Sequence, residues 1–260
     1  MKAMILAAGL GTRLRPLTND RPKALVTIAG RTLLEIALSR LRAFGIREVI
    51  VNAHHCAEMI VEYLKANNDF GMCIEVSREQ VLLDTGGGLK NAAHFFLHSK
   101  DGLQEPFIVH NVDVMSTIDL GRMAQFHADQ NALATLAVHD RESSRYLLFN
   151  EQGLLCGRRT GRAGDMATTN TEDGKAELAR PAAGMRALAF SGIHVLSPRI
   201  FAKMEEDGAF PIVAAYMRLA AQGEKIVAFR ADECYWRDLG SPESLLQAAQ
   251  DIATGKFSIT

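Results

Sequence analysis

The first half of the chain alternates short apolar runs with segments of helical periodicity. Apolar runs of strand length lie at residues 3–6, 49–52, 73–76 and 107–110, and amphipathic patterns of helix length lie at residues 33–44, 59–66, 88–96 and 120–130. This alternation predicts an α/β fold, with a Rossmann-like and mostly parallel sheet flanked by helices. Ligands of such sheets bind beyond the carboxyl ends of the strands, which directs attention to residues 7–15 and 111–113.

From Leu133 onward the pattern becomes more strand-like. Apolar runs of strand length lie at residues 133–138, 145–149, 153–156, 188–195 and 226–229, and helical patterns lie at residues 212–221 and 242–252. Residues 158–184 are polar and rich in glycine and threonine, which predicts a long flexible loop or lid. No internal repeat is present.

Composition narrows the class of protein. With 260 residues, 48% of them hydrophobic and 23% charged, the chain is typical of a soluble globular domain with a substantial core. No apolar run approaches the roughly 18 residues of a membrane span, and a strand begins directly after Lys2 without a visible signal peptide. We therefore expect a cytoplasmic location and no membrane partner. The formal net charge of −1 argues against a nucleic-acid partner, and four scattered cysteines without a C-x-x-C pair argue against a zinc site.

The segment LAAGLGTRLRPLT, residues 6–18, leads from the first predicted strand into small residues and two arginines. Backbone N–H groups of a glycine-rich turn can approach phosphate oxygens, and Arg13 and Arg15 add positive charge. The alternative is an ordinary strand-to-loop turn. A dinucleotide-binding fingerprint is excluded because Leu14 stands where its third glycine belongs, and a Walker loop is excluded because no lysine follows either glycine.

The following Pro22-Lys23 extends this segment to LAAGLGTRLRPLTNDRPKAL, which resembles the signature of the sugar-1-phosphate nucleotidyltransferases. Two later segments resemble motifs of the same family that carry metal-binding aspartates: HNVDV at residues 110–114 and WRDLGSPESL at residues 236–245. DTGGGL at residues 84–89 resembles the family's turn against the nucleotide base, and FSGIHV at residues 190–195 resembles a sugar-contacting strand. The resemblance thus covers nearly the whole chain.

The resemblance implies the nucleotide-diphospho-sugar transferase fold, as one domain over residues 1–260. Its nucleotide-binding half would cover about residues 1–135, and its sugar-phosphate-binding half about residues 136–260. The implied catalytic residues are Arg13, Lys23 and Asp113; the nucleotide-binding residues are Leu6, Ala8, Gly9, Gly11, Thr12, Arg13, Lys23, Asp84, Gly86 and Gly87; the sugar-binding residues are Asn111 and Gly192; and the metal ligands are Asp113 and Asp238.

The chemistry of these residue types agrees with that assignment. Mg²⁺ takes few protein carboxylates and completes its octahedron with phosphate oxygens and water, so two aspartates on separate loops are an expected pattern. In isolation either aspartate is more often a turn former or a helix cap. The three glycines at residues 86–88 would leave a surface against which a planar base can rest, although they also suit a loose helix start.

The expected reaction joins a nucleoside triphosphate, preferentially UTP, to a sugar 1-phosphate with the help of Mg²⁺. The alternatives are a guanylyltransferase for mannose or heptose 1-phosphate, a cytidylyltransferase for phosphocholine, and a sensing subunit without catalysis. Partners would be these small substrates, and the chain would be a monomer or a homodimer. Many relatives carry a Glu-Lys-Pro segment whose lysine meets the sugar phosphate, and this chain has none. The basic residues of the region are Arg158, Arg159, Arg162, Lys175, Arg180 and Arg186.

Overall fold

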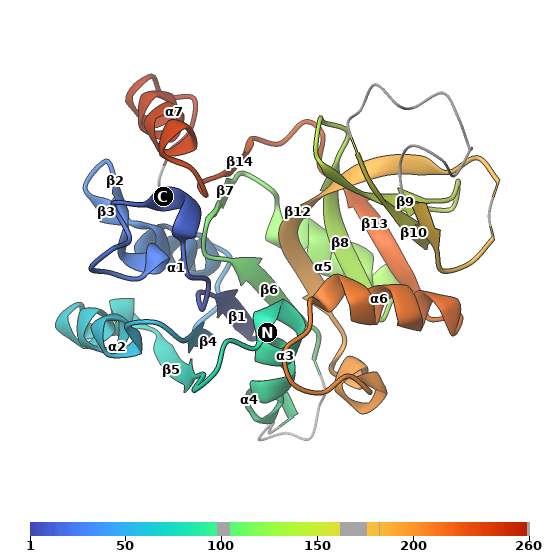
Figure 1. The fold of residues 1–260 in the computed structure, drawn as a ribbon, viewed down its shortest axis with the longest axis horizontal. Coiled ribbons are helices and arrows are strands. Elements are labelled where there is room, and N and C mark those ends of the chain that lie inside the picture. Colours follow the sequence, from blue (N-terminus) through green and yellow to red (C-terminus); the bar gives the residue numbers. More distant parts are fainter. Residues whose placement is uncertain (98–104, 162–175, 182, 259–260) are drawn as a thin grey trace.

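The computed structural model describes residues 1–97, 105–161, 176–181 and 183–258. Within them, helices flank one ten-stranded sheet (Figure 1). Its strands are β1 (Ala3–Leu6), β4 (Glu48–Ala53), β5 (Cys73–Arg78), β6 (Phe107–Asn111), β8 (Ala134–His139), β9 (Arg145–Phe149), β10 (Leu155–Thr160), β11 (Ala176–Leu178), β12 (Arg186–Leu196) and β13 (Ile226–Arg230). The α-helices are α1 (Leu33–Ala43), α2 (Ala57–Ala66), α3 (Asp84–Asn91), α4 (Ala93–Leu97), α5 (Leu120–Asp129), α6 (Ile212–Ala221) and α7 (Pro242–Ala253). None of these helices is both long and apolar enough to cross a membrane.

The sheet changes character between its two halves. Strands β6, β1, β4 and β5 lie in that order and run parallel, as the alternating pattern of the first half predicts. Strand β12 joins β6 in antiparallel orientation and also pairs with β8 and β9. Strand β10 follows β9, and β11 follows β10 at the edge of the sheet. The α/β fold predicted from the sequence is confirmed, and its parallel part carries the strand ends beside which the candidate site lies.

Alternate residues of the central strands feed two separate cores. Ile5 and Val51 belong to the core covered by α1, α2 and α5, whereas Met4 and Ile50 belong to the core covered by α3, α4 and α6. This division follows from the strand period of two, and it explains why these strands are apolar without interruption.

Three helices begin at side chains that accept a backbone hydrogen bond. The Thr32 hydroxyl accepts from the Glu35 N–H at the start of α1, and the Asp119 carboxylate accepts from the Arg122 N–H at the start of α5. Ser241 caps α7 in the same way, and Pro242 occupies its first turn. Each cap satisfies a donor that the first helical turn leaves free, typically worth about 1 kcal/mol.

Two small two-stranded sheets complete the described fold. Strand β2 (Thr27–Ile28) pairs with β3 (Arg31–Thr32), and β7 (Val114–Ser116) pairs with β14 (Trp236–Asp238). Strands of two or three residues are too short for periodicity to reveal them. The β7–β14 pair matters most, because it brings the C-terminal part of the chain to the end of β6.

The prediction of a loop over residues 158–184 is wrong at both ends. Strand β10 continues to Thr160, and β11 pairs with it in antiparallel orientation. Arg158 donates to the Glu177 carboxylate across this edge at 2.7 Å. Polar side chains suit strands at the edge of a sheet, where one face meets solvent, so polarity alone does not identify a loop. Residues 162–175 and 182 lie outside the described part of the chain.

The helix predicted over residues 88–96 is also corrected. It begins at Asp84 and divides at Ala92 into α3 and α4, so the DTGGGL segment is the first part of a helix and not a turn. The division places Phe96 of α4 in a stack with Phe107 and Phe201. Tertiary packing therefore overrides the low helix propensity of three successive glycines.

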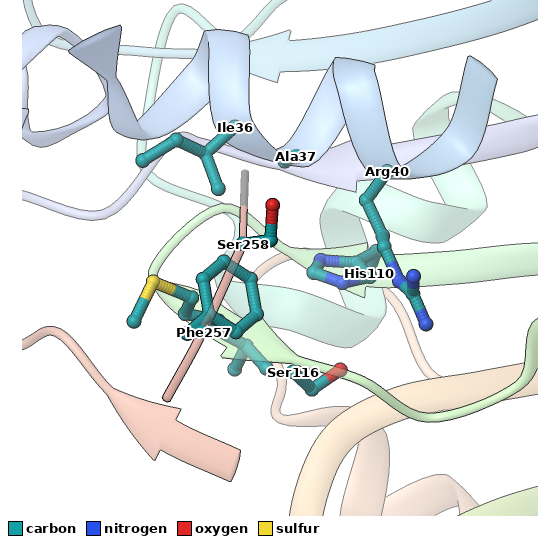
Figure 2. Close-up of a pocket in the computed structure, with 9 residues that line it drawn as sticks. Ile36, Ala37, Arg40, His110, Ser116, Phe257 and Ser258 are labelled. Atoms are coloured by element: carbon teal, nitrogen blue, oxygen red, sulfur yellow. The ribbon is translucent and has the colours of Figure 1, made fainter. Parts of the chain in front are cut away.

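Figure 2 shows a small cavity between α1, the β6–β7 segment and residues 257–258. Arg40, His110 and Ser116 line it, and its volume of about 10 Å³ excludes any substrate. His110 is buried, its Nδ1 lies 2.8 Å from the Asn111 carbonyl oxygen, and burial lowers the pKa of His110 to about 4. His110, which lies three positions before Asp113 in the sequence, is thus neutral at physiological pH.

Candidate active site

A cavity of about 510 Å³ opens at the carboxyl ends of the parallel strands. It is lined by Leu6, Ala8, Gly9, Lys23, Asn52, Leu82, Asp84, Thr85, Asn111, Val112, Asp113 and Ala209. This position is where doubly wound sheets bind their ligands, and the volume suits a nucleotide.

The glycine-rich segment after β1 forms one wall. Gly11 has a φ of 64° and precedes a short 3₁₀ helix over Thr12–Leu14. A Cβ at Gly11 would lie 2.9 Å from the Thr18 methyl group, while the Thr18 hydroxyl donates to the Gly11 carbonyl oxygen at 2.9 Å. Gly9 differs, because a Cβ there would meet nothing within 4 Å. Gly11 is therefore required by the turn, and Gly9 keeps open the wall of the cavity.

Lys23 and Asp113 form an ion pair that lines the cavity. Pro22 holds an extended conformation and Lys23 begins the next 3₁₀ helix, so the ammonium group leaves the loop in a fixed direction. Its Nζ forms a close ion pair with Asp113 Oδ2, and the two side chains are only 10% and 16% exposed. A buried lysine requires such a partner, and this pair places a cation and a carboxylate together in the cavity.

Asp238 reaches the same place from the C-terminal part of the chain. Strand β14 pairs with β7 in a register that sets Asp238 opposite Val114, and the Leu239 N–H donates to the Asp113 carbonyl oxygen at 2.7 Å. Arg13 Nη2 lies 3.8 Å from Asp238 Oδ1, with side chains 68% and 42% exposed. The fold thus brings Arg13, Lys23, Asp113 and Asp238 together as the resemblance implies, with an inner pair and a solvent-exposed outer pair.

The carboxylates of Asp113 and Asp238 suit a divalent cation whose other ligands come from a substrate and from water. No group of three or more histidine, cysteine or acidic residues capable of holding a metal occurs in the described residues. Two carboxylates on neighbouring loops are nevertheless a suitable donor set for Mg²⁺, which prefers oxygen and keeps positions for phosphate and water. Metal ligation by the two aspartates remains a prediction.

The three glycines of α3 do not form an open surface. Gly86, Gly87 and Gly88 are buried, and a Cβ at Gly86 would collide with the Phe210 ring. The Gly86 N–H donates to the Phe210 carbonyl oxygen at 2.9 Å. The glycines let α3 pack closely on this neighbouring segment. The predicted base surface therefore differs from the structure, in which Leu82, Asp84 and Thr85 face the cavity.

A buried pair that the sequence analysis missed ties these walls together. Asn52 Oδ1 accepts from the Ala7 N–H at 2.7 Å, and its Nδ2 donates to Glu79 Oε1 at 2.7 Å. Glu79 Oε2 accepts from the Leu83 N–H at 3.0 Å, just before α3. Both side chains are buried, so Asn52 and Glu79 connect the glycine-rich wall to the segment that begins α3. The sequence offered one signal for Asn52, because this polar residue ends the otherwise apolar run VIVN.

Asn111 and Gly192, the two predicted sugar-binding residues, pack on each other at the wall of the cavity. Gly192 has a φ of 72°, and a Cβ there would lie 2.7 Å from the Asn111 amide nitrogen. Asn111 lines the cavity, whereas Gly192 supports it from behind. Of the predicted residues, those that line the cavity are Leu6, Ala8, Gly9, Lys23, Asp84, Asn111 and Asp113. Those that lie around it without lining it are Gly11, Thr12, Arg13, Gly86, Gly87, Gly192 and Asp238.

Comparison with known proteins gives one consistent result. Residues 2–255 match the family described as nucleotidyl transferase. The chain is 34% identical to N-acetylmuramate alpha-1-phosphate uridylyltransferase of Caulobacter vibrioides, over 96% of each chain. It is 31% identical to mannose-1-phosphate guanylyltransferase 1 of Arabidopsis thaliana, over 95% of this chain but only 63% of that protein. The crystal structure of HddC from Yersinia pseudotuberculosis complexed with GMP-PN superposes with a TM-score of 0.72 at 22% identity, over 96% of this chain and 99% of that chain.

Proposed function

Because this chain belongs to the nucleotidyl transferase family, we propose that it transfers a uridylyl group from UTP to a sugar 1-phosphate and releases pyrophosphate. The chain is a nucleotidyltransferase by its match over residues 2–255 and by its relatives. The proposal adds the base, the acceptor class and the roles of the residues.

One observation carries the proposal: two cation–carboxylate pairs meet beside a nucleotide-sized cavity. Lys23 with Asp113 and Arg13 with Asp238 supply both the charges that gather phosphates and the carboxylates that suit a divalent cation. A sensing subunit needs affinity for its ligand but has no need of two metal-binding carboxylates. The pairing therefore supports an enzyme.

The reaction needs no nucleophile from the protein, because a phosphate oxygen of the sugar 1-phosphate is already anionic. That oxygen attacks the α-phosphorus of the nucleotide, the bond to the β-phosphate oxygen breaks, and pyrophosphate leaves. Catalysis then consists of positioning and charge stabilisation. The neutral, buried His110 is not required as a base.

Each residue of the site has a task in this mechanism. The N–H groups of residues 10–13 and the Arg13 guanidinium bind the β- and γ-phosphates. The Lys23 ammonium, already held in the cavity by Asp113, neutralises charge that develops on the α-phosphate. Asp113 and Asp238 would hold Mg²⁺, which supplies further neutralisation of phosphate charge when bound.

UTP and an amino-sugar 1-phosphate are proposed because the uridylyltransferase relative matches the chain over nearly its whole length. The segment from Leu82 to Thr85 would contact the base. A second candidate, GTP with mannose 1-phosphate, is favoured by the 31% identity to mannose-1-phosphate guanylyltransferases.

A substrate panel tests the proposal. The purified protein is incubated with Mg²⁺, with each of UTP, GTP, CTP and dTTP, and with 1-phosphates of N-acetylmuramate, N-acetylglucosamine, glucose and mannose, while pyrophosphate release is followed. Release that is fastest with UTP and an amino-sugar 1-phosphate supports the proposal. Preference for GTP and mannose 1-phosphate supports the second candidate, and silence across the panel contradicts both.

A further inference from the structure

An arginine near the candidate metal site stacks its guanidinium group on an aromatic ring. Arg141 follows β8, and its Cζ lies 3.8 Å from the ring centroid of Trp236 in β14. Its Nη2 donates to the Phe190 carbonyl oxygen and its Nη1 to the Glu142 carbonyl oxygen, each at 3.2 Å. Trp236 is fixed in turn, because its Nε1–H donates to the Ser191 carbonyl oxygen at 2.8 Å. The guanidinium plane is thus oriented without a substrate.

The position of Trp236 sets Arg141 next to Asp238. Trp236 and Asp238 are two residues apart in β14, so their side chains project from the same face of the strand. The Asp238 carboxylate attracts the Arg141 guanidinium, although burial has the larger effect and lowers the pKa of Arg141.

Arg141 forms no ion pair with any acidic side chain among the residues that the structure describes. Its Nε is buried and lacks a hydrogen-bond partner within that same part of the chain. A guanidinium has five N–H donors, and a half-buried one without a carboxylate is costly unless an anion completes its bonding. Nη1 and Nη2 each donate one N–H to a carbonyl oxygen, and because each carries two N–H groups, one on each nitrogen remains for such an anion.

The basic residues that the sequence analysis considered are placed differently. Arg158 is paired with Glu177 at the edge of the sheet, and Arg180 donates to the Glu224 carbonyl oxygen at 2.8 Å. Arg159 is also stacked, with 5.4 Å between its Cζ and the Tyr146 ring centroid, and its buried Nε and Nη2 lack partners within the described residues, but it lies in β10 and not against the strand that carries Asp238. Arg186 is exposed at the start of β12, and Arg162 and Lys175 lie outside the described residues. Arg141 was not among the candidates, because its partner Trp236 is remote in the sequence.

We propose that Arg141, stacked on Trp236 beside Asp238, binds the phosphate of the sugar 1-phosphate acceptor. This inference rests on the proposed function. The planar guanidinium would take two phosphate oxygens in a bidentate contact. Asp238 and Arg141 would then flank the attacking oxygen, which explains how the chain manages without the Glu-Lys-Pro lysine of other family members.

The test compares Arg141→Gln, Arg141→Lys and the control Arg145→Gln, which removes an exposed arginine from the start of β9. Initial rates are measured with sugar 1-phosphate and UTP varied in turn, and thermal unfolding checks the fold. We expect Arg141→Gln to raise the KM for the sugar 1-phosphate at least about tenfold and to leave the KM for UTP within about twofold. Arg141→Lys keeps the charge but loses the paired N–H donors of the guanidinium. Its KM for the sugar 1-phosphate should therefore lie between those of the wild type and Arg141→Gln. The control should match the wild type.

An unchanged KM for the sugar 1-phosphate in Arg141→Gln overturns the proposal. So does an equal rise in both KM values with a lowered unfolding temperature, because that result assigns Arg141 only to supporting Trp236. Should the wild type transfer no nucleotide, calorimetric titration with glucose 1-phosphate separates the two ideas. Binding by the wild type that Arg141→Gln loses keeps the phosphate site while the proposed function fails, and no binding by the wild type rejects both.

Discussion

The backbone N–H of Leu239 donates a 2.7 Å hydrogen bond to the carbonyl oxygen of Asp113. This bond extends the β7–β14 pairing and fixes two loops that are remote from each other in the sequence. The bond is made by backbone atoms and does not involve the carboxylates of Asp113 and Asp238, which pair with Lys23 and Arg13. The backbone therefore brings the two aspartates together independently of these ion pairs.

Replacement of Asp113 by Asn tests the part of this carboxylate in catalysis. The amide keeps the shape of the side chain but loses the charge that pairs with Lys23 and suits a divalent cation. We expect turnover to fall by at least about 100-fold. The unfolding temperature should also fall, because the Lys23 ammonium loses its buried counter-charge, while the backbone bond to Leu239 keeps the loop in place. Steady-state kinetics with a Mg²⁺ titration measures the effect. Asp20→Asn, which alters an exposed aspartate paired with Arg21, serves as the control. Wild-type turnover and Mg²⁺ dependence in Asp113→Asn would contradict the metal assignment.

Alanine at Gly86 and at Gly9 should have opposite consequences. A methyl group at Gly86 collides with the Phe210 ring, so Gly86→Ala should lower the free energy of unfolding by roughly 1–3 kcal/mol. A methyl group at Gly9 meets no protein atom but projects into the wall of the cavity. Gly9→Ala should therefore keep the wild-type stability and raise the KM for the nucleotide. Urea unfolding and kinetics on both variants check the pair, and equal effects on stability would argue against the two roles.

Asn52→Ala tests the buried connection between the two walls. The Ala7 N–H and the Glu79 carboxylate would each lose a partner in a buried place. We expect a loss of about 1–3 kcal/mol in unfolding free energy and a higher KM for the nucleotide, because the walls are no longer held together. Asn91→Ala, which removes a bond to the Ser77 hydroxyl outside the cavity, should leave the KM unchanged. Equal KM values in Asn52→Ala and the wild type would show that the pair serves stability alone.

Four buried histidines, His110, His127, His139 and His194, have pKa values lowered by burial, which makes stability depend on pH. Burial lowers the pKa of His110 and His127 to about 4 and that of His194 to about 3, all below the ordinary value of 6.5. The unfolded chain therefore binds more protons below pH 6.5. Stability is fully present above that pH and is lost as pH falls toward 4, by up to about 1.4 kcal/mol per pH unit for each histidine. Urea unfolding between pH 7.5 and 4.5 should show this decline, with a shallower slope in His127→Asn. A flat profile would contradict the neutral, buried state.

The parallel half of the fold could be predicted because its signals are local. The apolar run at Ala3–Leu6 and the periodicity of α1 depend only on neighbouring residues, and the family was identified from motifs around Gly9, Lys23, Asp113 and Asp238. Strand β14 carries no comparable signal, since three residues have no period and its partner is remote. The loose helix start considered for the three glycines is confirmed, but the predicted helix began at residue 88 and not at Asp84, because the packing of these glycines on Phe210 is not visible in the sequence.

The same distinction applies to the site. Arg13 and Lys23 lie in one motif, so their types and spacing suffice to find them. Asn52, Glu79 and Arg141 depend on partners that only the folded chain brings near: Ala7, Leu83 and Trp236. Residues whose role depends on a partner that is remote in the sequence therefore escape a search by motif.

The most direct test of the account follows the phosphorus atoms themselves. Wild-type protein, Asp113→Asn and Asp238→Asn are each incubated with Mg²⁺, UTP and N-acetylmuramate 1-phosphate, and ³¹P NMR records the products. The account predicts that the wild type forms one pyrophosphate for each new diphosphate-linked sugar, only when the acceptor is present, and that both variants form neither at a comparable rate. Pyrophosphate release without the acceptor, or equal product from either variant, would contradict uridylyl transfer at this pair of aspartates.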